Sequence, residues 1–422
     1  MRIFSVLTAL ILALAPFYTV AGNKNRQIVK SFADLRDTPL AQVKCAADLK
    51  PRPPAIKTGP NGLPLFNENS KLFSAQPSAS VYGQDALLLG QIVKRVKLGT
   101  AESPRPTHWK TVFYNVKNLV MRVGRSERGD TRPPKPVVPL HQELKSPEQI
   151  DWQRNLLSQA AFNQAVLVEV ASGDDLKEFF TDARFKMQYE DFLVEGNDIN
   201  RIDLGMVAQK GVRFEAVYVS YKNVKWKDPV DGVIDPVFPR DLPVMFLVDI
   251  ATGEIVLITV GKHGKSQLDR GGDKKSRIWR ESEFGASDQI VRQLLAEYGE
   301  EVRIIEGGDY NVETRGTESD CMTGMKKIMR SVFDLTPDPT PAGQRITETY
   351  HPKNGPTLLS QLDDAFVTKG LFSRILGARV IRYRSSRQSP TGTVLPYAQS
   401  FDQRSQQPSD HLPIEVEIDI AP

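Results

Sequence analysis

The sequence is poor in cysteine, and this excludes several classes of protein. It has 2 cysteines in 422 residues, Cys45 and Cys321, and neither lies in a CxxC pair or a Cys/His cluster. A structural zinc finger and a small scaffold held together by disulfides are therefore excluded. In an exported protein the two cysteines could form one disulfide between the amino-terminal segment and the main body. Two separate buried thiols are the alternative, and the sequence leaves both open.

Long apolar runs are absent except at the amino terminus. Arg2 precedes an apolar run over residues 3–17, and the small-residue end Thr19-Val20-Ala21 follows it. The run is shorter than the roughly 20 residues that a membrane-spanning helix needs. The pattern is typical of a cleaved secretory signal. We therefore predict a signal peptide over residues 1–21, export to the periplasm or the extracellular medium, and no stable membrane span.

The sequence also lacks a strong excess of charge of one sign. The formal net charge is +4, and removing residues 1–21 takes away one charge, Arg2, which leaves +3. A balance this mild permits an anionic partner without requiring one. The sequence contains neither a GxxxxGK nucleotide loop nor a GxSxG nucleophile elbow. Nothing in it indicates an oligomeric state.

What the sequence does contain is an alternation of strand-like and helical segments. Its 40% apolar and 25% charged residues fit a soluble globular protein. We assign the main domain to residues 108–422 and an amino-terminal extension, Pro-rich in part, to residues 22–107. Within the extension the spacing of residues 85–96 favours a short amphipathic helix. Periodicity predicts helices over 146–164 and 287–298, a long loop over 385–407, and strands over 110–116, 165–170, 202–209, 214–221, 243–250, 255–260, 361–367, 379–384 and 414–420.

Residues 304–312, IIEGGDYNV, are the stretch around which the chain is organised. The two isoleucines suggest the end of a buried strand, and Gly307 and Gly308 a break where the backbone approaches another group closely. Asp309 and Asn311 stand two residues apart, so on an extended backbone they point the same way. A carboxylate and an amide oxygen together suit a hard cation such as Mg²⁺, or the phosphate that it carries. An ordinary turn capped by Asp and Asn is the alternative.

Further polar residues stand at the ends of other predicted strands or in the loops beside them. Loops at one end of a rigid sheet are where sites are built. Carboxylates with amide oxygens bind a hard divalent ion, and histidines paired with aspartates act as general bases or stabilise developing negative charge. Such a set is what metal-assisted hydrolysis of a phosphate ester requires. For Glu169, a position at the rim of a sheet is the alternative. The candidates are Asn115, Glu169, Asp203, His263, Asp309, Asn311, Asp363, Asp410 and His411.

Residues 262–280 form the most basic stretch of the chain, with seven Lys or Arg residues against two Asp. A charged face exposed to solvent is the usual meaning of such a run. Because this run surrounds a glycine pair beside a candidate site, a loop that contacts phosphate is the alternative. The contacts would then come from Lys265, Arg270, Lys275 and Arg277.

Seven short motifs occur in one order along residues 108–421: YNVKN, LVEV, RIDLGMV, KHGKS, GGDYN, LDDAFV and SDHLP. Each motif alone is common, whereas seven in this order, each in a strand context, are specific. The chain resembles the endonuclease/exonuclease/phosphatase superfamily with its DNase I-like fold, and is especially similar to exported bacterial members. The resemblance implies an α/β fold, a four-layer α/β/β/α sandwich of two mixed β-sheets flanked by helices.

The resemblance also implies which residues hold the metal and activate water. Asn115, Glu169 and Asp410 would hold the ion, Mg²⁺ or Mn²⁺. Asp309 would activate or position the attacking water, and Asn311 would steady the transition state.

The same resemblance implies roles for two histidines and their partners. His263 would bind the scissile phosphate and would be oriented by Asp203, whereas Asp363 would orient His411. Two positions depart from the family pattern: Lys117 stands where relatives usually have Glu, and Lys262 where they usually have Asn. Neither replaced residue has a chemical role here, so the departures concern the fit of the substrate.

The implied chemistry is in-line attack of water on phosphorus with no covalent intermediate. We predict an exported phosphodiesterase that acts as a nuclease, with DNA or RNA as its partner. A phosphatase or phospholipase-like hydrolase of a small or lipid phosphate is the first alternative, since only the rim of the site would differ. A non-catalytic module that binds a phosphate-bearing partner is the second.

Overall fold

The computed structural model describes the strand residues 18–22 and 25–29, and residues 56–422 except 75, 84–86, 122–144, 199–201, 316–320, 353–355, 388 and 390. Most of the predicted signal peptide and Cys45 lie outside the described residues, so the signal and the disulfide stay predictions. The chain divides into two units, residues 1–55 and 56–422. In the first, β1 (Tyr18–Gly22) and β2 (Asn25–Val29) form an antiparallel pair.

The second unit contains a sheet of eight strands. Only the β14–β15 and β3–β5 pairs are parallel. The strands, in their order across the sheet, are β16 (Met329–Ser331), β19 (Asp363–Thr368), β15 (Ile304–Asp309), β14 (Ile255–His263), β13 (Val244–Asp249), β10 (Phe214–Ser220), β5 (Gly90–Lys97) and β3 (Phe73–Ser74).

A second sheet has six strands, with one parallel pair, β6–β7. Its strands in order are β20 (Ile375–Val380), β21 (Ile414–Asp419), β6 (His108–Leu119), β7 (Gln164–Val170), β9 (Asp203–Gln209) and β8 (Tyr189–Leu193). Two small sheets lie outside these: β4 (Ser80–Val81) with β11 (Val224–Lys227) and β12 (Ile234–Pro236), and β17 (Glu348–Tyr350) with β18 (Leu358–Ser360).

The described helices are fewer than the strands, and α4 is the longest of them. They are α2 (Pro147–Ser158), α3 (Gly173–Phe180), α4 (Arg277–Tyr298), α5 (Thr323–Lys326) and α6 (Phe401–Gln406), with 3₁₀ turns η4 (Lys274–Ser276), η6 (Val332–Asp334), η7 (Ala342–Gln344) and η8 (Lys369–Leu371). None of the helices within the described ranges is long and apolar enough to cross a membrane.

Strand alternation builds three separate cores. In β10, Val217 packs with α4, while Ala216 and Tyr218 face the six-stranded sheet. In β7, Val166 belongs to the core between the sheets and Leu167 to the core beneath α2 and α3. Successive residues of a strand face opposite sides, so each sheet is apolar on both faces.

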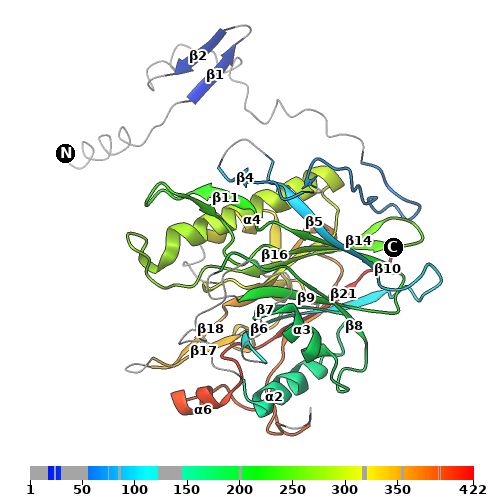
Figure 1. Ribbon diagram of the computed structural model, residues 1–422, viewed down its shortest axis with the longest axis vertical. Coiled ribbons are helices and arrows are strands. Elements are labelled where there is room, and N and C mark those ends of the chain that lie inside the picture. The colour runs from blue at the N-terminus through cyan, green and yellow to red at the C-terminus, as the bar shows by residue number, and fades with distance from the viewer. Residues whose placement is uncertain are drawn as a thin grey trace. The chain divides into compact units, whose positions relative to one another are not determined.

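The layers therefore run from α4 through the eight-stranded and six-stranded sheets to α2 and α3 (Figure 1). This confirms the predicted four-layer α/β/β/α sandwich of two mixed sheets.

Several local predictions differ from the structure. The helix predicted over residues 85–96 is wrong, since residues 90–97 form β5, which pairs with β10 inside the large sheet. Part of the predicted extension is thus built into the core. The strand predicted over 379–384 lies earlier, at β20, and the predicted loop 385–407 contains α6. Gly307 and Gly308 do not break the strand, because both lie within β15.

Candidate active site

Three neighbouring strands of the large sheet place acid and base side chains in one row. His263 ends β14 and is the register partner of Asp309 on β15. Asp309 is in turn the partner of Asp363 on β19. All three are buried. Residues far apart in the sequence therefore meet because of strand register alone.

Two glycines allow a close backbone approach beside this row, Gly307 toward the second sheet and Gly308 toward β14 of the same sheet. A Cβ atom on Gly307 would lie 2.7 Å from the ring of Phe113 on β6. Gly308 has a φ of +142°, and a Cβ there would lie 2.0 Å from the carbonyl oxygen of Lys262. The close approach predicted at these glycines is confirmed, and it brings β6 against β15.

The second sheet contributes Asn115 from β6 and Glu169 from β7. Asn115 Nδ2 donates to Glu169 Oε1 at 3.1 Å and to Asp309 Oδ2 at 3.0 Å. Glu169 has a φ of +67° at a register shift in β7, so a bulge turns its side chain toward the row. A left-handed backbone at a residue other than glycine costs about 1–3 kcal/mol and is concentrated at functional sites.

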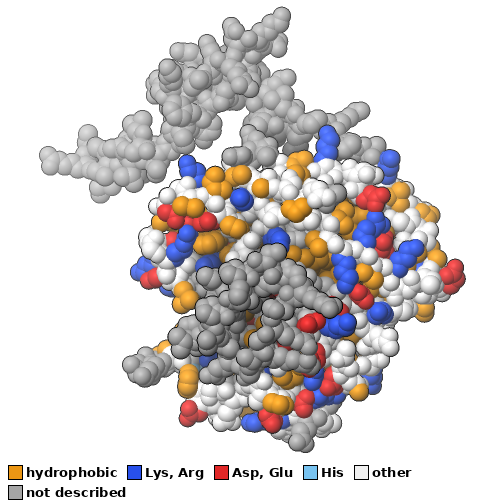
Figure 2. Space-filling view, in the orientation of Figure 1, with side chains coloured by type: hydrophobic (Ala, Val, Ile, Leu, Met, Phe, Trp, Pro, Cys, Tyr) orange, Lys and Arg blue, Asp and Glu red, His pale blue; other side chains and the backbone are white. Residues whose placement is uncertain are grey.

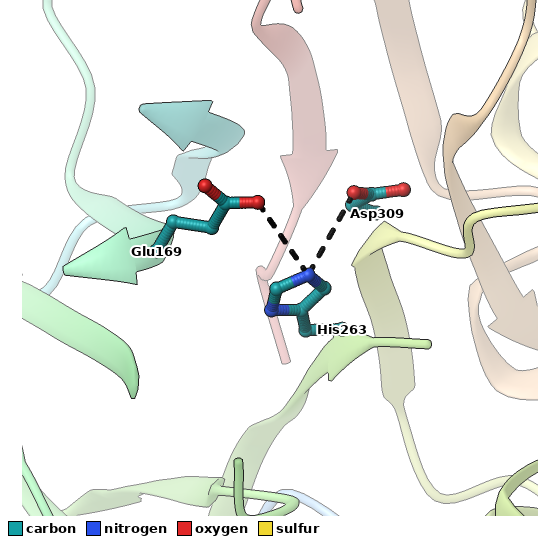
Figure 3. A group of neighbouring side chains, drawn as sticks. All are labelled: Glu169, His263 and Asp309. Carbon is teal, nitrogen blue, oxygen red and sulfur yellow. Dashed lines mark ion pairs between the residues drawn. The ribbon is translucent and has the colours of Figure 1, made fainter. Parts of the chain in front are cut away.

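Glu169, His263 and Asp309 form a group that suits a divalent ion. His263 Nε2 lies 3.8 Å from Glu169 Oε1 and 3.9 Å from Asp309 Oδ2, with the ring pointing between the two carboxylates (Figure 3). Ligand atoms of one Mg²⁺ lie about 3 Å apart when adjacent and about 4 Å when opposite, since each bond is about 2.1 Å. Two carboxylates suit a hard cation, so Glu169 and Asp309 fit Mg²⁺ or Mn²⁺. Asn115, predicted to hold the ion, turns its Nδ2 toward these carboxylates, and its Oδ1 accepts from Lys117 N.

His263 is held in its neutral form. Burial, together with Arg240 and His411, holds the pKa of His263 well below its usual range. Its Nδ1 atom is buried and has no hydrogen-bond partner in the described part of the chain. Asp203, predicted to orient this ring, accepts a hydrogen bond from Gly196 N at 2.7 Å through Oδ1.

Asp309 is the most highly connected carboxylate of the site. Its Oδ1 accepts from Asn311 N at 2.7 Å, and its Oδ2 accepts from Asn311 Nδ2 at 3.1 Å. Asn311 has a φ of +52°, which folds it back onto Asp309 instead of extending the strand. Burial, reinforced by Asp363, raises the pKa of Asp309 to about 6. Asp309 can therefore accept a proton near neutral pH, which is the requirement for a general base.

His411 and Asp363 form a buried acid–base pair. His411 Nδ1 lies 2.7 Å from Asp363 Oδ2, and His411 Nε2 lies 3.9 Å from Asp309 Oδ2. Burial disfavours the imidazolium, but Asp363 and Asp309 hold the pKa of His411 well above its usual range. The predicted orientation of His411 by Asp363 is present in the structure. A protonated His411 cannot bind a metal, so the Asp309–Asp363–His411 group is better suited to proton transfer.

Asp410 is near these groups but belongs to neither of them. Its Oδ2 contacts Arg404 Nη2, and Lys117 Nζ lies 3.7 Å from the same oxygen. The structure therefore does not bring Asp410 into the two groups of possible metal ligands formed by described residues.

Three buried charged residues near the site were not predicted from the sequence. Arg240 forms an ion pair with Asp198, with Nε 2.7 Å from Oδ2, and its Nη1 is buried without a hydrogen-bond partner in the described ranges. Burial raises the pKa of Glu348, beside His411, to about 7. Burial lowers the pKa of Lys145 to about 7. A lone arginine among apolar residues and prolines, FPRDLP, was the available signal for Arg240.

The basic loop before α4 is held in place by its own hydrogen bonds. Asp273 accepts hydrogen bonds from the backbone of Ile278 and Trp279, at 2.9 and 3.1 Å. Arg280 Nη1 donates to the carbonyl oxygens of Lys265 and Lys275, at 2.9 and 3.0 Å. These bonds hold the two ends of the loop together.

The four predicted phosphate contacts differ in their partners. Arg270 pairs with Asp228, and Arg277 with Glu281. Lys265 and Lys275 have no ion pair with a carboxylate that the structure describes, so these two are the better candidates to meet an anion.

Comparison with known proteins gives fold-level likenesses. No family model matches the sequence, and no curated protein matches it. Among solved structures, the chain is similar to truncated TDP2 from Caenorhabditis elegans, with a TM-score of 0.43, 12% identity, and coverage of 74% of this chain and 98% of that chain. It is also similar to an endonuclease/exonuclease/phosphatase from Bacteroides vulgatus, with a TM-score of 0.43, 13% identity, and coverage of 74% of this chain and 99% of that chain. A mannosyl-6-phosphatase from Bacteroides thetaiotaomicron has a TM-score of 0.44, 16% identity, and coverage of 73% of this chain and 98% of that chain. The Bacteroides vulgatus protein bears the name of the family that the sequence motifs resemble.

Proposed function

We propose that the chain is an exported, divalent-metal-dependent phosphodiesterase, and that it hydrolyses DNA or RNA as a nuclease. The observation that carries the proposal is the row of His263, Asp309 and Asp363, which brings a metal-type donor group and a His–Asp pair to one place. Metal-assisted hydrolysis of a phosphate ester with acid–base catalysis uses both. A divalent ion bound beside Glu169 would neutralise charge on the phosphate and hold it in line for attack.

The side chains of the chain supply the proton transfers. As the oxygen of the attacking water bonds to phosphorus, Asp309 takes a proton from that water. The bond from phosphorus to the leaving oxygen breaks, and the proton of His411 passes to that oxygen. Asp363 holds the imidazolium in place through Nδ1, which leaves Nε2 to face the reaction. The neutral ring of His263 lies against the same carboxylates and contacts the phosphate.

A nucleic acid is the substrate that the basic loop favours. Lys265 and Lys275 project from a loop that directly follows His263, so adjacent phosphates of a polymer would reach them. On the face shown in Figure 2, basic and acidic side chains are interspersed and do not form one patch. Polymer binding would therefore rest on a few residues near the site, and its dependence on salt would be modest.

A lipid phosphate is the second candidate, and one observation favours it. Leu268 is 73% exposed in the same basic loop, and Val233 and Ile234 are 50% and 56% exposed on the hairpin of β11 and β12. Arg270 ties the loop to this hairpin through Asp228. Exposed aliphatic side chains beside basic ones are a common pattern at lipid surfaces.

The test is a substrate panel with purified mature protein. Plasmid DNA, single-stranded DNA, RNA, inositol phosphates and phospholipid vesicles are assayed with Mg²⁺, with Mn²⁺ and with chelator. We expect cleavage of polymer with either ion and none with chelator. Release of phosphate or of a lipid head group would choose the second candidate. A folded protein that binds divalent ions and leaves every substrate intact would support the non-catalytic module.

Variants separate the chemistry from the fold. His263→Ala, Asp309→Ala and His411→Ala should each lower the rate at least 100-fold, which corresponds to about 3 kcal/mol of transition-state stabilisation. His108→Ala is the matched control, because His108 is exposed at the start of β6 and should keep full activity. An equal loss in the His108 variant would show that the assay reports folding.

The recognition of polymer is tested by charge removal in the loop. Lys265→Ala with Lys275→Ala should weaken binding of nucleic acid and flatten its salt dependence by about one unit of slope for each phosphate that the loop no longer neutralises. Hydrolysis of a small chromogenic diester should change much less. Lys177→Ala with Lys186→Ala removes the same charge from exposed positions on the α3 side and is the control. Equal losses on polymer and small diester would show that the loop supports the site and does not bind polymer.

A further inference from the structure

Asp410, which the sequence assigns to the metal, is surrounded by cations of the chain itself. Its Oδ2 contacts Arg404 Nη2, from α6, and lies 3.7 Å from Lys117 Nζ, from β6. Its side chain is only 16% exposed. Although burial opposes ionisation, His411, Lys117 and Arg404 hold the pKa of Asp410 below its usual range. Asp410 is thus a carboxylate whose charge is already balanced within the protein.

The backbone around Lys117 is shaped to keep this arrangement. Lys117 and Asn118 both have left-handed conformations, with φ of +49° and +55°, at a register shift between β6 and β7. The turn is held by Lys117 N, which donates to Asn115 Oδ1 at 2.9 Å. Because left-handed conformations are unfavourable for residues with a Cβ, the surrounding contacts must hold this bulge in place.

The segment that carries Asp410 is fixed to the same strand. Ser409 Oγ donates to the carbonyl oxygen of Asn115 at 2.8 Å and accepts from His411 N at 3.1 Å. These bonds fix the backbone on both sides of Asp410 and place His411 beside it.

A third basic side chain, Lys145, lies near the same cluster. It is buried at the start of α2, and its Nζ donates to the carbonyl oxygen of Pro408. Its pKa responds to Lys117, Asp410 and Glu169, so its ammonium lies near all three. A divalent ion at Asp410 would be added to a place that already holds the cations Lys117 and Arg404, with the buried amine of Lys145 near them, and their repulsion would oppose it.

We infer that this chain binds a single divalent ion, beside Glu169 and Asp309, and that Lys117, Lys145 and Arg404 take the place of a second ion at Asp410. The inference rests on the proposed function, because it assumes that the Glu169–Asp309 group is the metal site. It assigns Asp410 to charge balance and to the position of the loop before β21, and not to the metal.

The test is direct ion binding to the full chain. Titration with Mn²⁺, followed by the electron paramagnetic resonance of the free ion, should give one ion per chain. Asp410→Asn should keep one ion, with less than a threefold change in affinity, while Glu169→Gln should weaken binding at least 30-fold. Lys117→Gln with Arg404→Gln releases Asp410 and should allow a second ion to bind.

Two results would overturn the inference: two ions bound to the unsubstituted chain, or a tenfold or larger loss of affinity in Asp410→Asn. Thermal unfolding of each variant checks its fold, and the stoichiometry of the unsubstituted chain decides the matter even if a variant is unstable. Hydrolysis measured on the same samples separates the two proposals. Activity with two ions bound would refute only the single-ion inference, and one bound ion without hydrolysis of any substrate would refute only the proposed function.

Discussion

Replacing Asp363 with Asn should move the alkaline limit of activity to lower pH. Asp363 Oδ2 lies 2.7 Å from His411 Nδ1, and both side chains are buried. A hydrogen bond to a charged group contributes about 1.5–3 kcal/mol. One pH unit corresponds to about 1.4 kcal/mol, so the loss of this charge should lower the pKa of His411 by about 1–2 units.

The sign follows from which form of His411 is active. Its pKa is raised above the usual value by Asp363 and Asp309, so the proton is present below that pKa and is lost as pH rises through it. In Asp363→Asn, His411 should lose its proton at a lower pH, so kcat/KM should begin to fall at a lower pH. The measurements are kcat/KM against pH at saturating Mg²⁺ and a ¹⁵N NMR titration of the histidine rings in chelator.

The neighbouring residue provides a matched control. Asp364 is buried on the same strand but faces the other way, and it accepts hydrogen bonds from Ser331 Oγ and Gln361 Nε2 at 2.9 and 2.7 Å. Asp364→Asn should cost about 1–2 kcal/mol of stability and leave the pH profile unchanged. An unchanged alkaline limit in Asp363→Asn, or an equal shift in Asp364→Asn, would refute the role given to the His411–Asp363 pair.

Three further predictions concern other parts of the chain. The pKa of Asp309 is raised to about 6 in the metal-free chain, so protons compete with the ion for this carboxylate as pH falls through 6, and the affinity for Mn²⁺ should decline below that pH, as titrations at pH 5 and pH 7 will show. Arg240→Met removes the buried ion pair with Asp198 and should lower the free energy of unfolding, measured with urea, by about 3 kcal/mol or more. A decrease of less than about 1 kcal/mol would contradict this prediction. If Cys45 and Cys321 form a disulfide, which would stabilise the fold by about 2–4 kcal/mol, denatured protein that has not been reduced should show no titratable thiol, and two thiols would refute it.

The sequence allowed the candidate residues to be found but not their arrangement. Asp309 and Asn311 could be identified because short polar residues directly follow a buried strand. That Asp309 faces His263 on one side and Asp363 on the other depends on pairing between distant strands, which no local pattern encodes. The role of Asn115 as the donor that joins two carboxylates was equally hidden, because it needs the contact between the sheets.

One wrong prediction and one assignment that is still open have similar physical causes. The stretch 85–96 is short, and its apolar residues are clustered, so a period of 3.6 and a period of 2 cannot be separated there. Pairing with β10 decides for a strand. Asp410 carries the expected motif, but its partner Arg404 lies on α6, in a stretch whose composition indicated a loop. Composition identifies a residue that can bind metal, and only the surrounding charges decide whether it will.

The position of β21 in the six-stranded sheet bears on how this protein folds. Ile414 on β21 pairs with Phe113 on β6, and Ser409 Oγ bonds to the backbone of Asn115 across 294 residues of sequence. Contacts of such long range cost loop-closure entropy and slow the folding of a chain. Until β21 has docked beside β6, His411 is not next to Asp363. The acid–base pair therefore forms no earlier than this docking, and a chain in which β21 is undocked lacks the pair.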